Sequence, residues 1–235
     1  DAQGLMKSAF LVTKFARGTK HGFSFRTARE GLSAMVYDRT HEIDNKKHAI
    51  TRTRDLFAAT LGYKLPKLSP NASINLKSRV ETCNRLVLIT QSSKKTKAWT
   101  SHAWRFVIEH ALKQFKDILL PVGNEAEYEN VEKICVGLPV NIAKKIPLTD
   151  LACKIKSARA VISIDTGLAH VADAVGKPLL ILFGPTLPNL VGPVGQNSTI
   201  IKSSSSMMSD ISHTDVIDWI NRLHIASDES NQGSF

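Results

Sequence analysis

The clearest indication of the fold is the segment Ala160-Val-Ile-Ser-Ile-Asp-Thr-Gly-Leu-Ala-His170. Its first five residues form a short apolar run, which is typical of a strand covered on both faces. The polar pair Asp165 and Thr166 follows at once, and Gly167 opens a helical pattern that continues to Val175. A strand, a polar turn and a helix in this order predict a parallel sheet with helices on both of its faces.

The same alternation extends to both sides of this stretch. Further strands are predicted at Leu86–Thr90, Asp117–Leu120 and Pro178–Phe183. Helices are predicted between and after the strands, at Trp104–Phe115, Glu125–Cys135, Asp150–Ser157 and along the face of Val216, Trp219, Ile220 and Leu223. The sequence therefore predicts an α/β domain over residues 81–224, followed by a polar tail at 225–235.

The first part of the chain has a helical pattern instead. One helix is predicted from Leu5 to Ala16, and a second from Thr27 to Tyr37, where Thr27 and Glu30 have the spacing of a capping box. A third places Ile50, Arg54, Phe57 and Leu61 on one face and ends at Gly62. These helices define a region at 1–64, and residues 65–80, with two prolines and no periodicity, are predicted to be a linker.

Composition narrows the class of protein. The 235 residues carry a net charge of +10 and are 43% hydrophobic, which is ordinary for a globular protein. The three cysteines are too few and too scattered for a disulfide framework or a zinc site, so a reducing compartment is expected. No apolar run approaches the roughly 20 residues of a membrane-spanning helix.

The positive charge is concentrated in the first two thirds of the chain. Residues 1–70 have a net charge of +7, residues 71–155 of +5 and residues 156–235 of −2. This distribution favours an anionic partner, either nucleic acid, an anionic membrane surface or a phosphorylated substrate, although a solvated basic face has the same composition. Aromatic residues do not alternate with the basic ones, and no nucleic-acid-binding motif is present, so nucleic acid is not expected.

Polar loops follow the predicted strands, and ligands bind parallel sheets at the carboxyl ends of their strands. The loop Gln91–Lys97 combines hydroxyls and lysines before a helix, which suits a phosphate, although it lacks the glycines of a Walker A loop. A solvated basic turn would have the same composition. The loop Asp165–His170 offers a carboxylate, a glycine where a ligand can approach the backbone, and a helix N-terminus.

That second loop is also compatible with a capped helix and a packed histidine. A third loop, Gly184–Gly192, follows the strand at 178–183, and three loops at one sheet edge favour a binding site over any one alone. Asp-x-Asp pairs, Gly-x-Ser-x-Gly elbows and His-Glu-x-x-His motifs are absent from the sequence, so it gives no support to metal-dependent or serine-nucleophile chemistry.

The motif Asp165-Thr-Gly-Leu-Ala-His170 continues with Ala172, Gly176-Lys-Pro178 and Phe183-Gly-Pro-Thr186. Together these residues resemble the donor-site signature of glycosyltransferase family nine, the bacterial lipopolysaccharide heptosyltransferases. The opening is similar to the branch that adds the first heptose to the Kdo sugar of the inner core, through Asp1-Ala-Gln-Gly-Leu-x-Lys-Ser8, His21-Gly, Thr27-Ala-Arg-Glu30, Tyr37 and Arg52-Thr-Arg54.

The resemblance implies a GT-B fold, with a C-terminal Rossmann-like domain and the helical remnant of an incomplete N-terminal one. It implies an inverting transfer of L-glycero-D-manno-heptose from ADP-heptose to Kdo2-lipid A, with no cofactor and no metal. It also implies a cytoplasmic protein that works peripherally on the anionic cytoplasmic face of the inner membrane.

The resemblance further implies roles for individual residues. Ser92, Ser93 and Lys97 match positions that hold the donor diphosphate, and Lys97 would stabilise the departing ADP. Glu127 matches a position near the ribose and Ile146 one beside the adenine. The remaining contacts to diphosphate and heptose fall on Asp165, Thr166, Gly167, Leu168 and His170. Arg29, Arg52 and Arg54 are candidates for the acceptor's phosphates and carboxylates, or are surface charges.

The family places its catalytic base, a carboxylate, in a loop that this sequence does not contain, and Asp1 matches a different aspartate. We therefore expect the chain to be a fragment that does not transfer heptose by itself. Two other functions remain open at this point: a non-catalytic module that binds a nucleotide or phosphate through the same loops, and a basic nucleic-acid-binding protein, whose affinity would fall steeply with salt.

Overall fold

The computed structural model describes residues 1–67, 73–76 and 81–232, with residues 224–232 described by their backbone alone. The chain forms two compact units. The first comprises Asp1–Pro70 together with Asn189–Val191, and the second comprises Asn71–Pro188 and Gly192–Phe235. The change from one unit to the other, at residues 70–71, falls within the segment predicted as a linker, which lies largely outside the described residues.

The second unit is built on a six-stranded parallel sheet. Its strands are β3 (Arg85–Ile89), β4 (Asp117–Val122), β5 (Asn141–Lys144), β6 (Ala160–Ile164), β7 (Leu179–Phe183) and β8 (Ser198–Lys202). They lie in the order β5-β4-β3-β6-β7-β8, so β3 and β6 are neighbours although two strands intervene between them in sequence. The predicted α/β class with a parallel sheet is confirmed.

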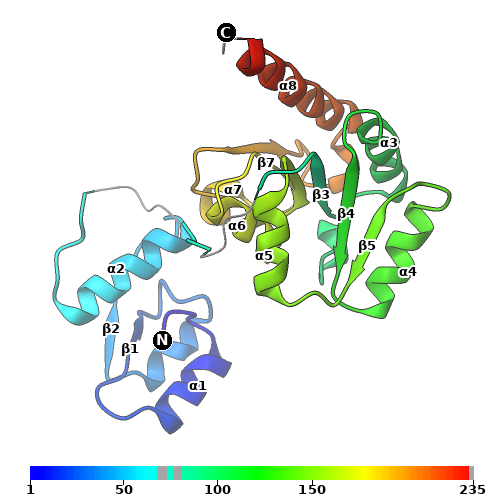
Figure 1. The fold of residues 1–235 in the computed structure, drawn as a ribbon. Coiled ribbons are helices and arrows are strands. Elements are labelled where there is room, and N and C mark those ends of the chain that lie inside the picture. The colour runs from blue at the N-terminus through cyan, green and yellow to red at the C-terminus, as the bar shows by residue number, and fades with distance from the viewer. Residues whose placement is uncertain (68–72, 77–80, 233–235) are drawn as a thin grey trace. The chain divides into compact units, whose positions relative to one another are not determined.

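Helices cover both faces of this sheet (Figure 1). One face packs against α3 (Ser101–Ala111), α4 (Glu125–Ile134) and α8 (His213–Gln232), and the other against α5 (Leu148–Ser157) and α6 (Gly167–Ala174). Alternate residues of the central strands point to opposite faces. Leu86, Leu88 and Ile162 join the first layer and are fully buried there, together with Trp104 of α3 and Ile220 of α8.

Two strands were missed by the sequence analysis, β5 and β8. Both lie at the edges of the sheet, and most of their residues are exposed or half-buried. Edge strands are covered on fewer sides than central ones, so Asn141-Ile-Ala-Lys144 needs no apolar run to be stable. The apolar runs that predicted β3, β4, β6 and β7 are a property of central strands.

The helix α8 continues to Gln232, through residues 225–232 of the segment predicted as a polar tail. The segment from Ala226 to Gln232 is polar but contains neither glycine nor proline, and Gly233 is the first residue there that disfavours a helix. Polarity alone therefore did not mark the end of the helix.

The first unit contains α1 (Met6–Phe15), β1 (His21–Phe23), the 3-10 segment η1 (Gly31–Val36), β2 (Arg39–His41) and α2 (Ala49–Leu61). The strands β1 and β2, which were not predicted, pair in parallel, so this unit contains a short sheet beside its helices. Each strand has only three residues, which is too short to give a periodic pattern. A further short helix, α7 (Pro188–Val191), contains the three residues 189–191 that are assigned to the first unit, whereas its first residue, Pro188, belongs to the second.

The helix predicted at Thr27–Tyr37 is also wrong, because its capping residues have other partners. The Thr27 hydroxyl hydrogen-bonds the Ser24 hydroxyl. The Glu30 carboxylate accepts a hydrogen bond of 2.6 Å from the Met6 N–H, so it caps the N-terminus of α1 instead. The predicted helix thus shrinks to the 3-10 turns of η1.

The helix α2 is confirmed, and Gly62 ends it in the left-handed conformation with φ of 71°. Its predicted apolar face is only partly correct. Phe57 and Leu61 are 50% and 68% exposed, whereas Leu56 and Ala58 are buried. The spacing of three to four residues that identified the predicted face therefore does not coincide with the buried face of α2.

Two histidines meet where β1 and β2 pair. The His21 Nδ1 and His41 Nε2 atoms are 2.9 Å apart, and the rings are stacked. Burial lowers the pKa of His41 below its ordinary value, and the charges of His21 and Arg39 lower it further. A hydrogen bond between two imidazoles needs one neutral ring as its acceptor, which agrees with this direction.

Replacing His21 by glutamine is expected to raise the pKa of His41 toward its ordinary value without restoring it fully. The like charge of His21 disappears, but burial, the larger cause, remains. An NMR titration of the imidazole resonances measures this directly, with His102→Gln in the second unit as the control. An unchanged or lower His41 pKa in the His21→Gln variant would contradict the stated cause.

Within the described residues, no helix is both long and apolar enough to cross a membrane.

Candidate functional site

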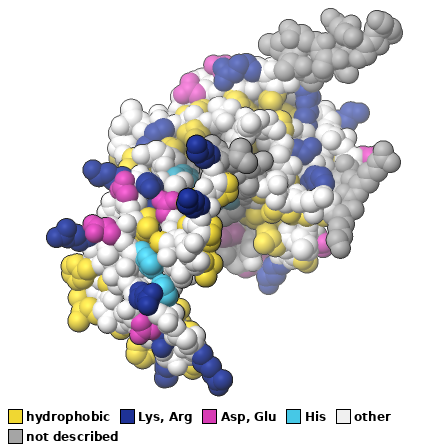
Figure 2. Space-filling model, turned by 90° about the vertical axis from the view of Figure 1, so that its left-hand side faces the viewer, with side chains coloured by type: hydrophobic (Ala, Val, Ile, Leu, Met, Phe, Trp, Pro, Cys, Tyr) yellow, Lys and Arg dark blue, Asp and Glu magenta, His cyan; other side chains and the backbone are white. Residues whose placement is uncertain are grey.

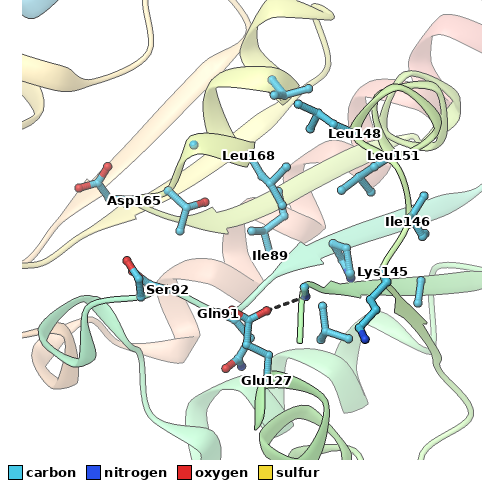
Figure 3. A pocket seen from close by; sticks show the side chains of 18 of the residues that line it. Ile89, Gln91, Ser92, Glu127, Lys145, Ile146, Leu148, Leu151, Asp165 and Leu168 are labelled. Carbon is cyan, nitrogen blue, oxygen red and sulfur yellow. Dashed lines mark hydrogen bonds between the residues drawn. The ribbon is translucent and has the colours of Figure 1, made fainter. Parts of the chain in front are cut away.

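The second unit has a cavity of about 870 Å³ where β3 and β6 end. These are the neighbouring strands at which the strand order reverses, and in doubly wound sheets this is where ligands bind. The loops after β3, β4, β5 and β6 all contribute to its wall. Figure 3 shows Ser92 and Asp165 at one end of the cavity, and Ile146 and Leu151 at the other.

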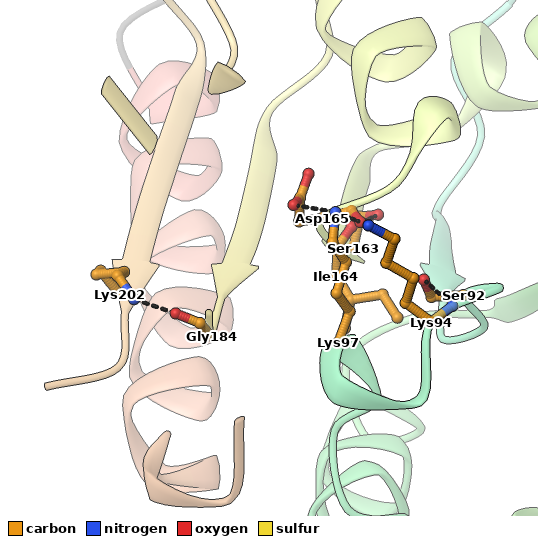
Figure 4. Close-up of polar contacts among 8 residues, drawn as sticks. All are labelled: Ser92, Lys94, Lys97, Ser163, Ile164, Asp165, Gly184 and Lys202. Atoms are coloured by element: carbon orange, nitrogen blue, oxygen red, sulfur yellow. Dashed lines mark hydrogen bonds and ion pairs between the residues drawn. The ribbon is translucent and has the colours of Figure 1, made fainter. Parts of the chain in front are cut away.

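The polar end is organised by an ion pair between the two predicted loops. The Lys97 Nζ atom lies 2.5 Å from the Asp165 Oδ2 atom, and it also approaches the Asp165 carbonyl oxygen. Asp165 is almost buried, while 21% of the Lys97 side chain is exposed. Figure 4 shows this pair beside Ser92, whose hydroxyl accepts a hydrogen bond from the Lys94 N–H. The ion pair with Asp165 thus fixes the position of the Lys97 ammonium group at the cavity wall.

The N-terminus of α6 closes this polar end. Thr166 is its N-cap residue, and its Oγ1 atom is buried without a hydrogen-bond partner among the described residues. A Cβ atom added at Gly167 would meet no atom within 4 Å, so there is open space in front of the helix. Unpaired backbone N–H groups in the first turn of a helix favour a negatively charged ligand.

The other end of the cavity is apolar. Ile146 follows β5, Leu148 and Leu151 come from the start of α5, and Ile89 and Leu168 complete the wall. Leu148 is 61% exposed, so this wall has an apolar rim open to solvent. A flat, weakly polar group fits such a slot better than a charged one.

Glu127 lies between the two ends, and its position has a local structural cause. Its carboxylate accepts a hydrogen bond of 2.7 Å from the Gly123 N–H, and its own N–H donates to the side chain of Asn124, the N-cap of α4. Glu127 thus fixes the loop that follows β4. One of its two carboxylate oxygens makes this contact and is held at the cavity wall.

Nine of the ten predicted donor-site residues line the cavity: Ser92, Ser93, Lys97, Glu127, Ile146, Asp165, Thr166, Gly167 and Leu168. His170 does not line it, and its side chain is exposed on α6. The third predicted loop, Gly184–Gly192, contributes no residue to the lining of this cavity. The Gly184 carbonyl accepts from Lys202 instead (Figure 4).

Sequence reasoning missed several lining residues, among them Gln91, Lys94 and Lys145. Gln91 and Lys94 belong to a loop that was identified as a candidate, but without a role of their own. Lys145 follows β5, the strand that was not predicted, and its φ of 47° is unusual for a residue other than glycine. Lys145 was therefore not predicted, because the strand that it follows was not predicted either.

The three candidate acceptor arginines lie in the first unit and differ from one another. Arg52 donates a hydrogen bond of 2.6 Å to the Thr27 carbonyl oxygen, and its guanidinium lies over the Phe23 ring. It therefore has a packing role within the unit. Arg29 is exposed and Arg54 is half-buried.

Groups of three or more His, Cys, Asp or Glu residues placed to hold a metal ion do not occur in the described part of the chain.

The chain is similar to known proteins over most of its length. The family model described as glycosyltransferase family 9 (heptosyltransferase) matches residues 1–220. Lipopolysaccharide heptosyltransferase 1 of Escherichia coli strain K12 is 34% identical over 230 residues, which cover 95% of this chain and 72% of that protein. The enzyme of the same name from Pseudomonas aeruginosa is 32% identical over 207 residues, covering 86% of this chain and 58% of that protein.

Solved structures give the same result. The E. coli heptosyltransferase WaaC with ADP matches with a TM-score of 0.82 at 33% identity, over 95% of this chain and 71% of that one. The E. coli ADP-heptose heptosyltransferase II has a TM-score of 0.74 at 17% identity, over 96% of this chain and 75% of that one, which shows the fold alone. The resemblance drawn from the motifs is confirmed, and the chain belongs to glycosyltransferase family 9, the heptosyltransferases.

Proposed function

We propose that this protein binds ADP-heptose in the cavity of its second unit and serves the transfer of L-glycero-D-manno-heptose to the Kdo sugar of Kdo2-lipid A. One observation carries the proposal: a single cavity joins the Lys97–Asp165 pair and the start of α6 at one end to an apolar slot at the other. A nucleoside diphosphate sugar is divided in the same way, since its diphosphate is charged and its base is flat and weakly polar. The match to a relative solved with ADP supports this choice.

In this proposal each part of the cavity has its own contact with the donor. The adenine lies against Ile146, and Glu127 receives hydrogen bonds from the ribose hydroxyls. The diphosphate lies at the start of α6 within reach of Lys97, and the Ser92 and Ser93 hydroxyls donate to its oxygens. Asp165 then accepts a hydrogen bond from a heptose hydroxyl, because Lys97 pairs with the phosphates in place of the Asp165 carboxylate.

The transfer step places the largest demand on Lys97. An acceptor hydroxyl attacks the anomeric carbon with inversion, the bond from that carbon to the phosphate oxygen breaks, and ADP departs with additional negative charge. An ammonium group already held at this position stabilises that charge as it forms. The hydroxyl proton passes to a carboxylate base, which we assign to no residue of this chain.

The acceptor is an anionic lipid, so we propose that the protein works at the cytoplasmic face of the inner membrane. Arg29 and Arg54 of the basic first unit are proposed to meet the acceptor's phosphates and carboxylates. Arg52 is proposed to attract the acceptor only through its positive charge. Its guanidinium already hydrogen-bonds the Thr27 carbonyl oxygen and packs on the Phe23 ring.

A thermal melt with and without nucleotide tests the donor site. ADP at about one hundred times its dissociation constant is expected to raise the melting temperature by about 5 °C or more, and AMP to raise it less, because only ADP has the second phosphate. Ile146→Asp, which places a carboxylate in the apolar slot, is expected to remove most of the ADP effect. Leu187→Asp, on an exposed residue of the third loop, is the matched control.

A melt that does not respond to ADP would contradict the donor site. Nucleic acid that raises the melting temperature where ADP does not would favour the nucleic-acid-binding alternative. An ADP response without any preference for ADP-heptose over ADP would favour the non-catalytic nucleotide-binding module, since the proposed Asp165 contact would then be missing.

A further inference from the structure

The cavity of the second unit has a lysine at its apolar end that no contact within the protein explains. Lys145 is exposed, follows β5 and lines this cavity. Figure 3 shows it close to Ile146, at the end away from Ser92 and Asp165. In the part of the chain that the structure describes, its ammonium group makes no hydrogen bond and no ion pair. The charge is therefore available to a ligand.

The neighbouring Lys144 shows what a lysine with a structural role looks like at this place. Its Nζ atom lies 3.2 Å from the Glu125 Oε1 atom and 3.3 Å from the centre of the Tyr128 ring, so it joins β5 to α4. Lys144 does not line the cavity. Two consecutive lysines thus differ in their surroundings, since one is held by α4 and the other stands at the cavity wall.

The backbone of Lys145 is also unusual. Lysines are common in a protein with a net charge of +10, and Figure 2 shows Lys and Arg side chains scattered over one face of the molecule. Lys145, however, has a φ of 47°, which strains a residue with a Cβ atom but not a glycine. Its N–H donates to the Val122 carbonyl oxygen at 3.0 Å and so holds this conformation. A lysine where the backbone favours glycine points to a use of its side chain that offsets the strain.

The wall around Lys145 offers a ligand few polar contacts. The lining residues that come from β4, β5, the loops after them and the start of α5 are aliphatic, proline or glycine, apart from Lys145 itself. Glu127 of α4 adds a carboxylate, which accepts hydrogen bonds but donates none. Lys145 is therefore the one lining side chain from these elements that can donate. A purine base carries ring nitrogens that accept, and enclosing such a nitrogen without a donor is costly.

We infer that the Lys145 ammonium donates a hydrogen bond to a ring nitrogen of the adenine base and makes Lys145 a specificity-determining residue of the donor site. The inference deepens the proposed function and rests on it, since it concerns the base of the same nucleotide. The ribose fits this role less well, because its hydroxyls are proposed to donate to Glu127. The diphosphate is proposed to lie at the other end of the cavity, beside Lys97.

Calorimetric titration of the full chain with ADP and with its 1-deaza, 3-deaza and 7-deaza analogues tests the inference. Each analogue replaces one ring nitrogen by a C–H group that cannot accept a hydrogen bond. One of the three is expected to bind the unaltered protein about tenfold more weakly than ADP does, the effect of one hydrogen bond from a charged donor. Lys145→Met is expected to weaken ADP binding about tenfold, and to bind that analogue no more weakly than the unaltered protein does.

Three further variants separate this contact from general charge and from folding. Lys144→Met removes the adjacent positive charge outside the cavity and is the matched control, expected to change the ADP dissociation constant by less than about twofold. Lys145→Arg keeps a charged donor and is expected to lose less than about threefold. Lys145→Gly relieves the strained backbone, so it is expected to keep or raise the melting temperature while it weakens ADP binding like Lys145→Met.

Each other result overturns the inference. An unchanged ADP affinity in Lys145→Met shows that the side chain does not contact the nucleotide. A loss of the same size for ADP and all three analogues, or for Lys144→Met as well, assigns the effect to charge and not to a ring nitrogen. A lower melting temperature of Lys145→Gly gives the residue a structural role. Failure of the unaltered protein to bind ADP contradicts the proposed donor site itself, so the two failures are distinguishable.

Discussion

Replacing Lys97 by alanine weakens ADP binding about thirtyfold in our expectation, or about 2 kcal/mol, the size of a charge-assisted hydrogen bond to a phosphate. The ammonium group is largely shielded from solvent and stands at the cavity wall, where it meets the diphosphate. Isothermal titration calorimetry with ADP measures the effect. Lys95→Ala, on an exposed lysine two residues earlier that does not line the cavity, is the matched control.

The change Asp165→Asn should act in the opposite direction on ADP. The Asp165 carboxylate lies 2.5 Å from the Lys97 ammonium, so a diphosphate that binds Lys97 has to compete with this carboxylate. Removing the negative charge is expected to tighten ADP binding by about threefold to tenfold. Binding of ADP-heptose should gain less than that of ADP, because asparagine is a weaker acceptor for the heptose hydroxyl. If Asp165→Asn weakens ADP binding as much as Lys97→Ala does, the diphosphate does not compete with Asp165 for the Lys97 ammonium.

Replacing Asp173 by alanine is expected to lower the free energy of unfolding of the second unit by about 3 kcal/mol or more. This carboxylate of α6 is 6% exposed and accepts hydrogen bonds from the N–H groups of Val194 and Gly195 and from the Ser198 hydroxyl. It fixes the loop that leads into β8, and its removal leaves two backbone donors without an acceptor. Urea unfolding followed by circular dichroism measures the loss.

Two variants check that the cause is this network. Ser198→Ala removes one hydrogen bond and should cost about 1 kcal/mol. Gly195→Ala should cost more, since a Cβ atom there would lie 2.3 Å from the Asp173 Oδ1 atom. A small effect of Asp173→Ala beside a large one of Ser198→Ala would mean that the serine, and not the carboxylate, holds the loop.

The central part of the fold was predictable because burial leaves a mark in the sequence. The apolar runs at 86–90 and 160–164 correspond to β3 and β6, whose side chains are covered on both faces. The edge strands β5 and β8 lack that mark. In the first unit, Glu30 had the spacing of a local cap but bonds to Met6, 24 residues away, and no local pattern contains such a contact.

The candidate site divides in the same way. Its polar end was predictable, because Ser92, Lys97 and Asp165 lie in the polar loops that follow the central strands β3 and β6. The family resemblance was needed for Glu127 and Ile146, which have no distinctive local signal. Lys145 was not predicted because the strand before it was not. His170 was included by its place in the motif, but its exposed side chain lies outside the cavity wall.

The adjacency of β3 and β6 has a consequence for how the protein matures. Lys97 and Asp165 are 68 residues apart in sequence, and β4 and β5 are made between them before β6 can add beside β3. We therefore expect the ion pair to form late in folding, because closing a long segment costs entropy that the pairing of β3 with β6 has to offset. Nucleotide affinity should appear together with the finished sheet during synthesis, so ADP binding reports that the two halves of the domain have docked.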